Sequence, residues 1–136
     1  MSKSHPNPKS RIILTDTAQD IKSKIRVAVT DSINEVTYDP ITRPGVSNLI
    51  DIIFHLDPAG TSSVEELAAD LQGLPLKALK EKATDVIDEH LSPIRERYSA
   101  IVSDQSRLDE VAEIGAQRAN ETAKATMTLV RDAIGL

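Results

Sequence analysis

A lysine between two serines, Ser2-Lys3-Ser4, lies near the beginning of this chain, in its most basic region. Residues 1–45 contain seven Lys or Arg and five Asp or Glu, whereas residues 46–136 contain nine and sixteen. A mobile ammonium can follow phosphate groups and strengthen its contact as negative charge develops in a transition state. We therefore expect any phosphate contacts to lie in the first third of the chain. The basic residues there are Lys3, Lys9, Arg11, Lys22, Lys24, Arg26 and Arg43.

The composition argues against several other chemistries. The chain has no cysteine, which removes disulfides, thiolate metal sites and thiol nucleophiles. Its three histidines, His5, His55 and His90, are far apart and lack matched carboxylates, so we expect no metal site. A net charge of −5 argues against a general nucleic-acid binder, and no DNA partner is expected. No run of about 18 apolar residues occurs, so no membrane partner is expected either.

The elements that must position the basic region are predicted to be helices. Hydrophobic residues make up 40% of the chain but aromatic residues only 2%, which indicates an aliphatic core and favours packed helices over a sheet. Apolar residues spaced three and four apart, such as Ile21, Ile25, Ala28 and Val29 in the first, predict about five helices. These helices are expected over residues 18–30, 46–57, a short stretch capped by Thr61-Ser62-Ser63, residues 76–101, and a last stretch capped at Ser103-Asp104 or Ser106 whose apolar residues run from Leu108 to Ile134. The fold class is therefore all-α, a helical bundle preceded by a mobile loop.

Local signals refine these boundaries. Thr17, with Asp20 three residues later, is expected to cap the first helix. The apolar period continues across Pro93, so we expect a kink there rather than a break. Gly115 marks a possible bend in the last helix, and residues 12–14 form a short apolar run expected to be buried. We expect a loop and connector over residues 1–16 and a helical domain over 17–136.

Residues 31–45 are predicted to form a long loop. They contain two aspartates, an asparagine, two prolines and a glycine. A loop of this length is unusual in a compact domain and indicates a function. Asp31 has two interpretations at this point, an ordinary Asx turn or a binding residue. For Ser47-Asn48 we expect a structural role, in which Asn48 holds the loop against the core.

Several strings in fixed order resemble one family. Met1-Ser2-Lys3-Ser4 resembles the KMSKS loop of class I aminoacyl-tRNA synthetases without its first lysine, and His5 follows where the family often has an acidic residue or glycine. The strings further along are Ile13-Leu14-Thr15-Asp16, Ala28-Val29-Thr30-Asp31-Ser32, Val36-Thr37-Tyr38-Asp39-Pro40, Pro44-Gly45-Val46-Ser47-Asn48-Leu49-Ile50 and Pro93-Ile94-Arg95-Glu96-Arg97-Tyr98. Together they resemble the C-terminal part of a bacterial or mitochondrial-type tryptophanyl-tRNA synthetase. That part comprises the KMSKS loop and the helical anticodon-binding domain.

The resemblance implies a tryptophan–tRNA ligase that uses ATP and Mg²⁺ to charge tRNA. By position, Lys3 is the catalytic lysine, and Met1, Ser2, Lys3 and Ser4 contact ATP. The Rossmann-type catalytic domain and its HIGH-type motif have no counterpart in this chain. We therefore expect the chain to be inactive by itself.

The resemblance also implies an RNA partner, tRNA(Trp), whose anticodon reads CCA. Carboxylates accept from the amino group of cytosine, and basic side chains contact phosphates or base acceptors. Arg26 and Asp31 are the candidates for the bases, with Lys24 or Arg43 as phosphate contacts. Tryptophan and ATP would bind through the missing half, and the full-length enzyme would be a homodimer. A bacterial source would place it in the cytoplasm and a eukaryotic source in the mitochondrion, with no targeting segment within this chain.

Three alternatives remain open. Tyrosine enzymes share the fold and the KMSKS loop, although the Thr-Asp-Ser, Tyr-Asp-Pro and Pro-Gly-Val-Ser-Asn strings favour tryptophan. A second alternative is a stand-alone helical module, derived from such a ligase, that binds tRNA or a protein without catalysis. A third is a structural bundle that carries the tetrapeptide by chance, which the order of the strings disfavours.

Overall fold

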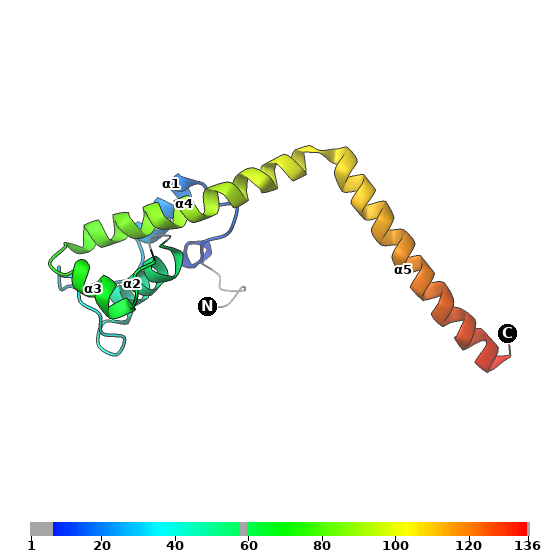
Figure 1. Ribbon diagram of the computed structural model, residues 1–136, viewed down its shortest axis with the longest axis horizontal. Coiled ribbons are helices and arrows are strands. Elements are labelled where there is room, and N and C mark those ends of the chain that lie inside the picture. Colours follow the sequence, from blue (N-terminus) through cyan, green and yellow to red (C-terminus); the bar gives the residue numbers. More distant parts are fainter. Residues whose placement is uncertain (1–6, 58–59, 136) are drawn as a thin grey trace. The chain divides into compact units, whose positions relative to one another are not determined.

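The computed structural model describes residues 7–57 and 60–135 of the chain. Within these residues all regular structure is helical, and the prediction of an all-α fold is confirmed (Figure 1). The elements are η1 (Pro8–Ser10), α1 (Ala18–Arg26), α2 (Pro44–Leu56), α3 (Val64–Asp70), α4 (Leu76–Ser103) and α5 (Gln105–Ile134). The predicted ATP-contacting residues Met1, Ser2, Lys3 and Ser4 lie outside the described residues.

The chain divides into two compact units, Met1–Arg95 and Glu96–Leu136. The expected boundary after residue 16 falls inside the first unit and stays a prediction. The first unit contains α1, α2, α3 and most of α4, and the second contains α5.

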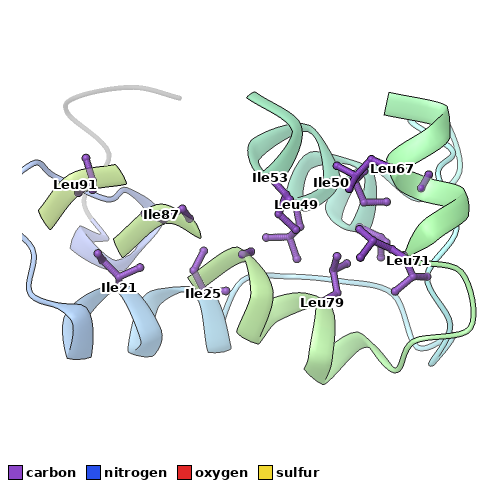
Figure 2. Packing of buried hydrophobic residues seen from close by; sticks show 14 residues of the cluster. Ile21, Ile25, Leu49, Ile50, Ile53, Leu67, Leu71, Leu79, Ile87 and Leu91 are labelled. Atoms are coloured by element: carbon purple, nitrogen blue, oxygen red, sulfur yellow. The ribbon is translucent and has the colours of Figure 1, made fainter. Parts of the chain in front are cut away.

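The core of the first unit is aliphatic, as the composition predicts. Ile21 of α1, Ile50 and Ile53 of α2 and Leu79 of α4 are completely buried, and Leu67 of α3 is nearly so. In Figure 2 Ile21 and Ile25 lie beside Ile87 and Leu91 at one end of the cluster, and Leu49, Ile50, Ile53, Leu67, Leu71 and Leu79 gather at the other. Burying one Leu or Ile side chain contributes about 1.5–3 kcal/mol, so this cluster supplies the main force that holds the unit together.

Helix α1 begins as predicted but ends earlier. The backbone N–H of Asp20 donates to the Thr17 hydroxyl at 3.2 Å, and the Asp20 carboxylate accepts from the Thr17 N–H at 3.1 Å, which closes a capping box. The helix stops at Arg26 rather than residue 30, and Val29 is 89% exposed rather than part of the apolar face. The Lys80 ammonium donates to the carbonyls of Arg26 and Ala28 and so satisfies acceptors at the helix end.

Helix α2 begins at Pro44, two residues before its predicted start. Proline suits the first turn because its missing N–H would have no helical partner there. Gly45, the next residue, lies against the chain that leaves α1. A Cβ atom at Gly45 would stand 2.3 Å from the Val29 carbonyl oxygen, so only glycine fits this approach.

The starts of α3 and α4 are fixed by side-chain caps. The Glu66 N–H donates to the Ser63 hydroxyl at 3.1 Å, and the Glu66 carboxylate accepts from the Ser62 N–H, so the predicted serine cap is confirmed. At the start of α4, the Leu76 N–H donates to the Asn34 side chain at 3.1 Å, across 42 residues of sequence. The helix then continues through Pro93, as the uninterrupted apolar period predicts.

The expectation that residues 12–14 are buried is wrong. Ile13 is 49% exposed and Leu14 is 59% exposed, and only Ile12 packs against the core. The buried side chain in this region is Asp16, whose carboxylate accepts from the Ile13 N–H at 2.9 Å. The resulting turn directs Ile13 and Leu14 outward.

The second unit contains the long helix α5. Asp104 caps it by accepting from the Arg107 N–H at 3.0 Å, and Gly135, with φ of +79°, ends it in the left-handed region. The helix runs through Gly115 without interruption, so the bend considered there does not divide it. No residue of α5 is buried in this structure. Among the described helices, none combines the length and apolar character that crossing a membrane requires.

Candidate functional site in the loop between α1 and α2

The loop of residues 27–43 is organised by one buried arginine. Arg43 donates from Nε and Nη2 to the two carboxylate oxygens of Asp31, at 2.8 Å each. Its Nη2 also donates to the Ile33 carbonyl, and its Nη1 donates to the Glu35 carbonyl and the Thr37 hydroxyl. A guanidinium has five N–H donors, and all five are engaged here. Arg43 therefore fixes the conformation of the loop from the inside.

The electrostatics of the pair follow from this geometry. The Arg43 side chain is 7% exposed and that of Asp31 is 28% exposed. The hydrogen bonds from Arg43 lower the pKa of Asp31 to about 2, and the same bonds raise the pKa of Arg43. Both groups therefore stay ionised at neutral pH. A two-point pair of this kind also fixes orientation, because planar carboxylate and guanidinium match edge to edge.

The second half of the loop is a turn built on Asp39. Its carboxylate accepts from the backbone N–H groups of Ile41 and Thr42 at 3.0 Å and from the Thr42 hydroxyl, and these bonds lower the pKa of Asp39. The Asp39 N–H donates to the hydroxyl of Ser47, which is buried at the start of α2. The expected structural role of the Ser-Asn pair is thus carried by Ser47, and the expectation for Asn48 is corrected. Asn48 itself lies exposed on the neighbouring turn.

The loop between α1 and α2 has an exposed surface whose backbone is held in place. Ile33, Asn34, Glu35 and Ile41 are exposed although the chain on both sides of them is held by Arg43 or Asp39. The Asp31 carboxylate accepts from Nε, Nη2 and the Ile33 N–H. A carboxylate offers about four lone-pair positions, and the Asp31 side chain is still 28% exposed, so an outside donor can reach it. The loop can therefore present a carboxylate acceptor in a fixed direction.

The predicted tRNA-contacting residues fall into three groups. The structure brings Asp31 and Arg43 into direct contact, and all donors of Arg43 are directed into the loop. Arg26 is exposed at the last position of α1. Lys24 pairs with Asp16 and is 15% exposed. A phosphate contact by Arg43 stays a prediction, which this geometry does not favour.

Sequence reasoning assigned no role to Lys80, Asp16 or Arg95. The Arg95 guanidinium donates to the Asp16 carbonyl and to the Asp88 carboxylate, and Asp16 also binds Lys24. The pair of Asp88 and Arg95 lies seven residues apart on one helix, a spacing that places both on one face and that could have been noticed. Lys80 gave no such signal, because its partners lie in a distant segment. Asp16 gave none either, because its contacts use both its backbone carbonyl and its carboxylate.

Metal binding is not indicated by the described part of the chain. Within it, no group of three or more histidine, aspartate or glutamate side chains is placed to hold an ion.

Comparisons with known proteins agree with the strings in the sequence. A family model described as "tRNA synthetases class I (W and Y)" matches residues 1–92. The chain belongs to this family. The tryptophan–tRNA ligase of Bacillus subtilis is 38% identical over 136 residues, all of this chain and 40% of that protein. The ligase of Corynebacterium glutamicum is 39% identical over 135 residues, 99% of this chain and 38% of that protein.

The comparison with solved structures agrees with the sequence comparisons. A crystal structure of tryptophanyl-tRNA synthetase from Mycoplasma pneumoniae matches with a TM-score of 0.69 and 28% identity, covering all of this chain and 42% of that one. A mitochondrial tryptophan–tRNA ligase from Dictyostelium discoideum is 35% identical over the whole chain. The chain spans about 40% of the length of the curated relatives that it matches, and it corresponds to their C-terminal part. The predicted resemblance is confirmed.

Proposed function

We propose that this chain is the C-terminal portion of a tryptophan–tRNA ligase. The observation that carries the proposal is an alignment that spans essentially the whole chain, at 38–39% identity, with proteins named tryptophan–tRNA ligase, while less than half of their length is covered. The parent activity would attach tryptophan to tRNA(Trp) at the expense of ATP, with Mg²⁺ beside the phosphates. The nucleotide-binding portion that precedes the matched segment in these relatives would supply the sites for ATP and tryptophan.

Lys3 is proposed as the catalytic lysine of the mobile loop. Adenylate formation places negative charge on the departing pyrophosphate, and an ammonium that strengthens its contact at that moment accelerates the step. Met1, Ser2 and Ser4 would line the same ATP-contacting loop. This assignment rests on the order of the family strings that follow Ser4.

The loop of residues 27–43 is proposed as a tRNA-contacting surface. The partly exposed carboxylate of Asp31 suits an amino group such as that of cytosine, and the exposed Arg26 suits a base acceptor or phosphate. Lys24 would contribute positive charge nearby on α1. Arg43 would act as a positioning residue, because it sets the direction of the Asp31 carboxylate.

The test uses a chimaera that joins the preceding portion of the Bacillus subtilis ligase to residues 1–136. We expect no ATP–pyrophosphate exchange by the chain alone and measurable exchange by the chimaera. Lys3→Ala should lower the exchange rate by at least about 10²-fold, the size of effect seen when one transition-state contact is removed. Lys124→Ala, an exposed lysine of α5, is the matched control. Equal rates for the two variants would remove Lys3 from the mechanism.

Two further properties of the parent enzyme are proposed on the same basis. The full-length enzyme would be a homodimer whose contacts involve the preceding portion. The relatives include bacterial enzymes and a mitochondrial one, which supports a bacterial cytoplasm or a mitochondrion as its location.

A further inference from the structure

Lys80 of α4 binds the chain where it leaves α1. Its ammonium donates to the Ala28 carbonyl at 2.8 Å and to the Arg26 carbonyl at 3.3 Å, 52 and 54 residues away in the sequence. The Lys80 side chain is partly buried, and Leu79 beside it is completely buried in the core. The core therefore holds the base of this lysine, and its ammonium holds the end of α1.

The start of α4 makes a second contact with the same loop. The Leu76 N–H donates to the Asn34 side chain at 3.1 Å. The two contacts lie on either side of Asp31, with Arg26 and Ala28 before it and Asn34 after it. The start of α4 therefore holds the backbone on both sides of the carboxylate that is proposed to face tRNA.

Arg43 and Lys80 hold different parts of this surface. Arg43 binds the Asp31 carboxylate and nearby carbonyls of the loop, so it fixes the loop internally. Lys80 binds main-chain carbonyls at the point where the loop leaves α1, so it fixes the loop relative to Arg26. A hydrogen bond weakens steeply once its atoms depart from about 3 Å, so contacts from Arg26 and Asp31 to bases need both supports.

The geometry favours a supporting role of Lys80 over a direct contact with phosphate. An ammonium has three donors, and two of those of Lys80 are bonded to carbonyls within the fold. Lys77, one turn earlier on α4, is 85% exposed and pairs with Glu81 at 3.8 Å. Lys77 is therefore better placed for solvent or phosphate, and it offers a matched control for the charge.

We infer that Lys80 is a positioning residue for the recognition of anticodon bases. The inference rests on the proposed function, because it concerns the same tRNA-contacting loop. Without Lys80, the carbonyls of Arg26 and Ala28 lose their donor and the segment that leads to Asp31 is free to shift. Contacts to base edges depend on direction and carry the sequence specificity, whereas phosphate contacts carry none. Loss of Lys80 should therefore reduce discrimination between anticodons more than general affinity for tRNA.

The test measures this discrimination with two tRNA(Trp) transcripts. One has the CCA anticodon, and the other has uracil in place of both cytosines, which removes the amino groups that a carboxylate can accept. Fluorescence anisotropy gives the affinity of each transcript for the chimaera with the Bacillus subtilis portion. The native chimaera should bind the first transcript at least about tenfold more tightly, the size of effect expected for a base contact.

Four variants of the chimaera then test Lys80. Lys80→Met keeps the apolar stem without donors, and Lys80→Gln has an amide too short to reach both carbonyls. Both should lower the ratio of the two affinities to below about threefold. Lys80→Arg keeps donors at the end of a long stem and should restore most of the ratio, whereas Lys77→Met removes the same charge from α4 and should leave the ratio unchanged. Circular dichroism at the assay temperature verifies that each variant is folded.

Two outcomes would overturn the inference. The first is an unchanged ratio in Lys80→Met and Lys80→Gln. The second is an equal loss of affinity for both transcripts, since a phosphate contact or a weakened fold affects both alike. A ratio in Lys80→Arg as low as in Lys80→Met would count against donation by this side chain.

The native chimaera separates this inference from the proposed function. If it discriminates between the transcripts and Lys80→Met does so equally, only the positioning role is removed. If the native chimaera does not discriminate, the loop is removed as a tRNA-contacting surface, and the positioning role with it. A ratio that falls in Lys80→Met, in a chimaera without ATP–pyrophosphate exchange, would support the positioning role and count against the ligase function.

Discussion

Arg43 holds Asp31 through two hydrogen bonds of 2.8 Å, one to each carboxylate oxygen. Asp31 lies in the first part of the loop that connects α1 with α2, and Arg43 is its last residue. The remaining three donors of Arg43 bind the segment between them. One side chain therefore gives a segment with no regular secondary structure a fixed shape.

Arg43→Lys should destabilise the first unit although it keeps the charge. An ammonium has three donors and no planar fork, so it cannot replace the five bonds of the guanidinium. We expect the melting temperature to fall by about 5 °C, as for a loss of roughly 1 kcal/mol in a domain of this size. Thermal unfolding followed by circular dichroism measures it. Arg118→Lys on exposed α5 is the control, and equal melting temperatures for both variants would show that the loop is held by other contacts.

The Asp31 pair should stabilise the fold in neutral solution and cease to do so in acid. The pKa of Asp31 is lowered to about 2 in the folded chain, below its ordinary value of about 3.9. A lowered folded pKa gives a contribution that is complete above the unfolded pKa and is lost as pH falls through the folded one. The loss should therefore occur between about pH 4 and pH 2.

Urea unfolding at a series of pH values measures that dependence. Asp31→Asn should lower stability at pH 7 and flatten the decline between about pH 4 and pH 2, since the titrating group is gone. Asp132→Asn, at an exposed carboxyl of α5, should leave both the stability and the slope close to those of the native chain. A decline of full steepness in Asp31→Asn would contradict the assigned role of the pair.

Gly45→Ala and Gly115→Ala should have opposite effects. A Cβ atom at Gly45 would lie 2.3 Å from the Val29 carbonyl oxygen, whereas nothing lies within 4 Å of one at Gly115. The first substitution forces the backbone apart and should cost about 1–3 kcal/mol. The second replaces glycine inside a helix and should stabilise α5 by about 0.5–1 kcal/mol. Chemical denaturation can measure the first and helical circular dichroism the second. A neutral Gly45→Ala would mean that the two segments are not held at this distance.

Arg26→Ala should weaken the binding of tRNA(Trp) if the loop surface contacts RNA. One lost phosphate contact lowers the salt dependence of binding by about one unit of slope, and one lost base contact costs about 1–3 kcal/mol. Binding of labelled tRNA(Trp) to the chimaera at several salt concentrations distinguishes these two roles. Arg118→Ala changes net charge equally and serves as the control. Identical affinity and slope for both variants would exclude Arg26 from the contact.

Features encoded over a few residues could be predicted from the sequence. The spacing of Ile21 and Ile25 marked the buried face of α1, and Thr17 with Asp20 marked its beginning. Such signals are readable because the atoms that form a cap or a helical face are neighbours along the chain. The family strings could be recognised for a different reason, since the order of residues along the chain does not depend on the fold.

Other features depended on contacts between distant segments. At the end of α1 the Lys80 ammonium donates to the Arg26 carbonyl, and at the start of α4 the Leu76 N–H donates to the Asn34 side chain. The sequence marked Asp31 and Arg43 as separate candidates for RNA, and only the fold revealed them as one ion pair. A side chain has no preferred long-range partner until packing brings one within about 3 Å, so its role is decided there.

By itself, the sequence determined the all-α class, the main helices, most of their caps and the synthetase family. The tertiary structure decided which polar groups are hydrogen-bonded within the fold and which stay exposed to a partner. It turned Arg43 inward, assigned the anchoring of the loop to Ser47 and left Val29 exposed. The physical reason is that helix formation and capping are local, whereas burial and hydrogen-bond satisfaction are properties of the assembled chain.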